Sequence, residues 1–91
     1  MERKRAIVLL NSLIFVFGAI AEKRFDDARS ALANLVERLE TEPGMESQDK
    51  ATLIAALRGA EEDLSSPSAD ERGTIAILER VSRKLWEDAV G

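Results

Sequence analysis

The stretch from Ala6 to Ala21 constrains this fold most, because sixteen consecutive residues there carry no charge. On a helix, with about 100° of rotation per residue, one broad face holds most of its large apolar side chains. That face comprises Ala6, Leu9, Leu10, Leu13, Val16, Phe17 and Ile20. The opposite side carries a second stripe without charged residues: Val8, Asn11, Phe15 and Gly18. A helix apolar on nearly all sides is central in its own fold, shared with a second subunit, or in lipid.

An export signal and a membrane anchor are two alternative interpretations of this stretch. A basic cluster, an apolar run and the A-x-A-like sequence Ala19-Ile20-Ala21 follow one another as in a signal peptide. The polar pair Asn11-Ser12 interrupts that run, and the run is shorter than the roughly twenty residues that cross a bilayer. We therefore favour a buried core helix. The alternative is an exported or membrane-tethered protein with residues 1–21 as signal or anchor.

The second stripe predicts a homodimer. A chain of 91 residues buries only a modest share of its surface alone, and a partner would cover the stripe. An Asn on such a stripe can fix the register between paired helices, or it can simply face solvent. Trp86 is a further interface candidate, because Trp is enriched in interface hot spots, although it could instead close the edge of the core. The predicted interface residues are Val8, Asn11, Phe15, Gly18 and Trp86.

Apolar spacing of three and four residues continues along the rest of the chain and predicts one all-α domain over residues 1–91. Its helices are expected at about residues 4–22, 25–42, 48–64 and 69–90. Pro43-Gly44 ends the second helix, Ser47 is a predicted N-cap, and Ser68 with Glu71 forms a capping box. No Gly or Pro marks a turn at residues 22–24, so residues 4–42 form either one long helix or a hairpin. The expected fold is a small bundle of three to four helices, completed by homodimerisation through the apolar first helix.

The chain contains neither His nor Cys. These absences remove the commonest general base, the usual thiolate nucleophile and the best transition-metal ligands. The acidic run Glu61-Glu62-Asp63 points in three directions on a helix and indicates a solvated surface rather than a cation site. We therefore predict a protein that is not an enzyme and that holds no cofactor and no metal.

The net charge of −4 disfavours a nucleic-acid partner, which would require a basic face. Charge is unevenly distributed: residues 1–24 hold five basic and two acidic residues, whereas residues 25–66 hold four basic and ten acidic residues. The sequence thus predicts a cytoplasmic, homodimeric protein–protein interaction module that acts as a small regulator or adaptor. A small acidic inhibitor that occupies a basic site on another protein is a further alternative.

Overall fold

A computed structural model describes residues 2–66 and 71–90, and all regular elements in that part of the chain are α-helices. Four helices follow one another: α1 (Arg3–Ala21), α2 (Phe25–Glu40), α3 (Ser47–Ser65) and α4 (Glu71–Val90). The predicted all-α helical bundle is confirmed.

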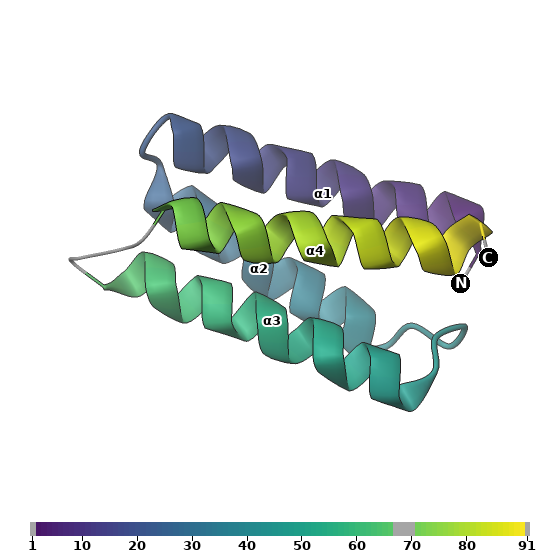
Figure 1. Cartoon of the computed structure of the whole chain (residues 1–91). Helices are drawn as coiled ribbons and strands as arrows, with labels where there is room; N and C mark the ends of the chain where they lie inside the picture. Colours follow the sequence, from purple (N-terminus) through teal and green to yellow (C-terminus); the bar gives the residue numbers. More distant parts are fainter. Residues whose placement is uncertain (1, 67–70, 91) are drawn as a thin grey trace.

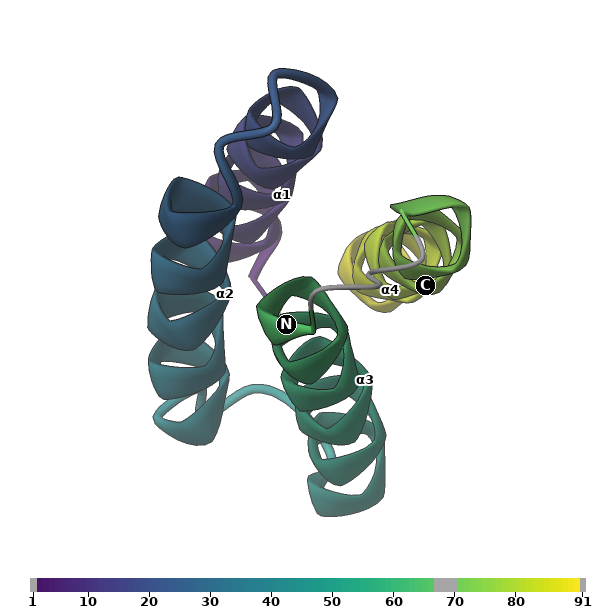
Figure 2. The same ribbon diagram turned by 90° about the vertical axis from the view of Figure 1, so that its left-hand side faces the viewer.

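The four helices form a ring in which each packs against two neighbours. α1 and α3 each contact both α2 and α4. Figure 1 shows that consecutive helices run in opposite directions, so that the start of α1 and the end of α4 lie at the same end of the bundle. Figure 2, viewed from one end, shows that α1 and α3 lie at opposite corners. The bundle measures 36 × 21 × 19 Å, and the helices run along its longest dimension.

Aliphatic side chains from all four helices fill the centre of the ring. Most are leucines spaced three or four residues apart, which places one stripe of each helix toward the centre. Full burial of each such side chain contributes about 1.5–3 kcal/mol. The contribution of α1 to the buried core comprises Ala6, Leu9, Leu13, Val16, Ala19 and Ile20.

The chain turns at residues 22–24, which decides between the hairpin and the single long helix in favour of the hairpin. The Lys23 amide donates to the Ile20 carbonyl (3.0 Å), and the Arg24 amide donates to the Ala19 carbonyl (2.8 Å). This pair of hydrogen bonds is the Schellman motif, which ends a helix with one left-handed residue. Lys23 is that residue, with φ of 63°.

Replacing Lys23 with glycine is expected to stabilise the turn. A side chain in the left-handed conformation costs about 1 kcal/mol that glycine does not incur. Lys23 also forms an exposed ion pair with Glu71 (2.5 Å), and pairs of this kind contribute little. Lys23→Ala is the control, because it removes the same ion pair but keeps the Cβ. In chemical denaturation, Lys23→Gly should exceed Lys23→Ala by about 1 kcal/mol; equal stabilities would contradict the left-handed assignment.

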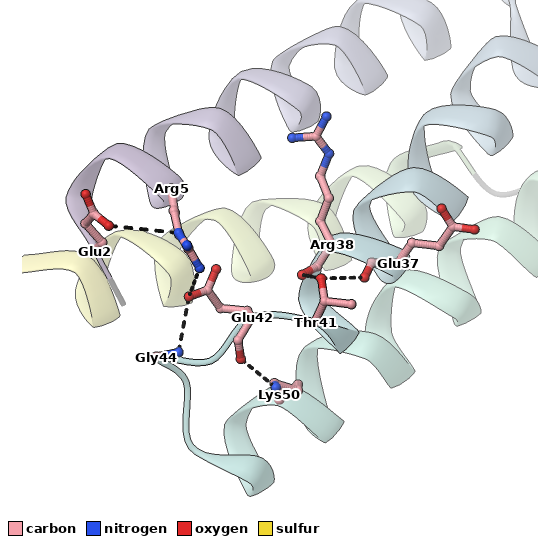
Figure 3. A network of polar contacts seen from close by, with 8 residues as sticks. All are labelled: Glu2, Arg5, Glu37, Arg38, Thr41, Glu42, Gly44 and Lys50. Atoms are coloured by element: carbon pink, nitrogen blue, oxygen red, sulfur yellow. Dashed lines mark hydrogen bonds and ion pairs between the residues drawn. The ribbon is translucent and has the colours of Figure 1, made fainter.

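The connection between α2 and α3 is held by Glu42, a buried acidic residue (Figure 3). Its Oε1 accepts hydrogen bonds from Arg5 Nη1 of α1 (3.5 Å) and from the Gly44 amide (3.2 Å). Its backbone carbonyl accepts a hydrogen bond from Lys50 Nζ of α3 (2.6 Å). Glu42 thereby ties this loop to the first turns of α1 and α3.

One predicted helix cap is wrong. Ser47 is the first residue of α3, and the N-cap position belongs to Glu46, which makes no side-chain capping bond. The Glu46 carbonyl still accepts the first helical hydrogen bond, from the Lys50 amide (2.9 Å). The predicted capping box of Ser68 and Glu71 includes Ser68, which lies outside the described residues.

Candidate protein interface

One face of α1 remains uncovered after the core is complete. Four of its large apolar side chains are 43–65 % exposed: Ile7, Val8, Ile14 and Phe15. Asn11 and Gly18 lie among them and are also exposed. These six residues together are called the outer face of α1. The core uses the opposite side of the helix. Because the apolar pattern of α1 extends around its whole circumference, large apolar side chains also remain on the outer face.

Four of the five predicted interface residues lie on the outer face of α1: Val8, Asn11, Phe15 and Gly18. The sequence interpretation missed Ile7 and Ile14, of which Ile14 is the most exposed large apolar side chain at 65 %. The signal that could have revealed them is the spacing of Ile7, Asn11, Ile14 and Gly18. They follow one another at intervals of four, three and four residues, which aligns them along one line of the helix.

The surface beside Gly18 is open. A Cβ built on Gly18 would have no neighbouring atom within 4 Å. This part of α1 could therefore receive a large side chain from outside the bundle.

A cation lies over the ring of Phe15, one residue of the outer face. The Arg24 guanidinium lies 5.7 Å from the centre of the Phe15 ring, within the range of a cation–π contact. Hydrogen bonds that Arg24 donates to Glu22 and to Asp27 raise the pKa of this guanidinium. Arg24 therefore borders the outer face as a fixed positive charge.

Trp86, the fifth predicted residue, is half-exposed on α4. Lys84, two residues earlier, pairs with Asp49 of α3 (3.5 Å), so the flank of α4 that carries Lys84 faces α3. Two residues advance a helix by about 200°, which places Trp86 on the other flank, toward α1. Figure 1 shows that α1 and α4 are antiparallel neighbours. Trp86 is therefore an exposed apolar side chain on the flank of α4 that faces α1.

Two further clefts lie at helix boundaries. A cleft of about 470 Å³ between α3 and α4 is mostly apolar, includes Ala56 and Gly59, and is bordered by Arg80 and Lys84. A cleft of about 700 Å³ between α2 and α3 is polar, and its Arg29 is engaged with Asp26 and with Ser65. Within residues 2–66 and 71–90, no group of three or more potential metal ligands gathers. Neither cleft presents a converging set of groups comparable with the outer face of α1.

α1 has a second property that bears on its interpretation. Among the described residues it is the one helix long and apolar enough to cross a membrane, judged by length and composition alone. Core helices of soluble proteins and signal sequences meet the same criteria. Comparison of this chain with protein-family models, curated proteins and solved structures finds no match.

Proposed function

We propose that this chain is a non-enzymatic helical interaction module that forms a homodimer through the outer face of α1. The observation that supports the proposal is the row of four large apolar side chains left exposed on a helix whose other side is already buried. Exposed apolar residues scattered singly are ordinary, but a contiguous group on one element marks an interaction site. A dimer of this kind would serve as a small regulator or adaptor.

The free energy gained by covering the apolar surface is similar in size to the cost of association. Covering four roughly half-exposed side chains contributes about 3–6 kcal/mol per chain at the usual transfer values. Two chains together therefore gain about 6–12 kcal/mol, against an association cost of roughly 4–15 kcal/mol. The dimer is therefore expected to dissociate on dilution, and its mass should be measured over a range of concentrations.

The substitution Phe15→Glu is expected to convert the dimer into a monomer. It places a charge in the proposed interface, where burial without a partner is costly, but it leaves the core untouched. Light scattering coupled to size exclusion should give twice the 10.0 kDa chain mass for the wild type and the single mass for the variant. Circular dichroism should show the same helical content in both proteins.

Ala51→Glu is the matched control for this experiment, because Ala51 is exposed on α3, away from α1. This variant should keep the dimer mass. A monomeric wild type at every concentration, or a Phe15→Glu variant that stays dimeric, would refute the proposed function. Aggregation of the wild type without detergent would instead support the alternative in which residues 1–21 act as a signal or anchor.

A further inference from the structure

We infer that the two copies of α1 pair antiparallel, with Ile7 of one chain packed against the partner's Gly18. The inference rests on the proposed dimer and adds its geometry. It joins three observations on the outer face of α1: the spacing of its residues, the alternation of large and small side chains, and the charges at its two ends.

Four residues of the outer face, continued by Ala21, have the spacing of a coiled-coil seam. Ile7, Asn11, Ile14, Gly18 and Ala21 are separated by four, three, four and three residues. This alternation holds a line of side chains against a second helix over several turns. A face that lies in lipid would need no such alternation and would gain nothing from an amide and a glycine at its centre. The pattern therefore favours a second helix over a membrane as the occupant.

The sizes of the seam residues favour antiparallel pairing. In a parallel dimer each layer pairs like with like, so Gly18 would face the partner's Gly18 across a gap. In an antiparallel dimer centred between residues 12 and 13, Ile7 faces the partner's Gly18, and Asn11 faces the partner's Ile14. The open surface beside Gly18 then receives the side chain of the partner's Ile7. Each of these facing pairs includes one isoleucine. The two Asn11 residues occupy neighbouring layers on either side of the two-fold axis.

The charges at the ends of α1 favour the same orientation. Parallel pairing would bring Arg3, Lys4 and Arg5 of both chains together at one end. Antiparallel pairing separates the two clusters by the length of α1 and places each beside the partner's Glu22, which also accepts hydrogen bonds from its own Arg24. It also places the positive N-terminus of each helix beside the negative C-terminus of the other.

Disulfide trapping distinguishes the two orientations. The chain has no cysteine, so Ile7→Cys and Gly18→Cys each introduce the only thiol of their variant. A mixture of the two variants under mild oxidation should form a disulfide between unlike chains, whereas either variant alone should remain uncrosslinked. In the antiparallel arrangement the two thiols of the Ile7→Cys dimer would be about 16 Å apart along the helix axis, at 1.5 Å per residue, which is beyond disulfide reach. Crosslinking within each single variant, with none between unlike chains, would overturn the inference.

A second variant, Gly18→Leu, keeps the test independent of thiol chemistry. In the antiparallel dimer it fills the space that Ile7 occupies and should weaken association at least tenfold. In a parallel dimer it would fill the gap between the two glycines and strengthen association instead. Tighter association with the leucine would therefore refute antiparallel pairing while leaving the homodimer intact. A monomeric wild type would refute both the inference and the proposed function. Binding of that monomer to phosphatidylserine vesicles would not change this conclusion.

Discussion

Replacing Leu13 with alanine is expected to lower the free energy of unfolding by about 2–5 kcal/mol, the usual cost of such a cavity in a core. The same replacement at Ile14 is expected to cost less than about 0.5 kcal/mol, as for most surface changes. The two residues are consecutive on α1, but Leu13 is 1 % exposed in the centre of the ring and Ile14 is 65 % exposed on the outer face. The pair therefore compares the two sides of one helix within a single turn.

This comparison belongs in the Phe15→Glu background, in which self-association is not expected to contribute to stability. Unfolding by urea, followed by circular dichroism, gives the free energy of each variant. Ile14→Ala should in addition weaken association of the otherwise wild-type chain. Similar destabilisation by Leu13→Ala and Ile14→Ala would mean that both sides of α1 are buried within one chain, and the outer face would no longer be a free surface.

Replacing Arg5 with methionine is the second large expected effect, at about 1–2 kcal/mol of lost stability. The substitution keeps much of the apolar stem and leaves the buried Glu42 carboxylate with one fewer hydrogen bond (Figure 3). The magnitude lies below that of a fully buried ion pair, because the Arg5 side chain is itself half-exposed. Thermal or urea unfolding measures the difference.

Arg3→Met is the matched control, because it makes the same change two residues away at an exposed position of α1. It should alter stability by less than about 0.5 kcal/mol. In a Glu42→Gln background the cost of Arg5→Met should fall, because the buried charge that Arg5 satisfies is gone. An unchanged cost in that background would show that Arg5 acts through packing rather than through Glu42.

The sequence pattern predicted the helices of this fold better than the turns that connect them. Apolar spacing of three and four residues indicates the helices directly, since the buried stripe of each helix follows that period. The turn after α1 has no comparable signal, because its left-handed residue is Lys23 where glycine is usual. Glu42 is likewise unremarkable in sequence, and its burial follows from the meeting of the connection between α2 and α3 with the distant first turn of α1.

The candidate interface was predicted in part for a related physical reason. Large side chains such as Val8 and Phe15 were recognisable as a stripe opposite the main apolar face. Ile7 and Ile14 lie at the border between the two faces on a helical wheel. Only the packing of α2 and α4 shows which border residues of α1 remain exposed.

The ring arrangement has a consequence for the synthesis of the chain. α1 leaves the ribosome before the other helices, yet one of its two neighbours is α4, which is made after them. About fifty residues separate the end of α2 from the end of α4, which corresponds to several seconds of translation at roughly 5–20 residues per second. During that interval α1, which carries no charge over residues 6–21, has a single partner for its inner side. The side of α1 that packs against α4 is therefore expected to stay exposed on the nascent chain until α4 completes the ring.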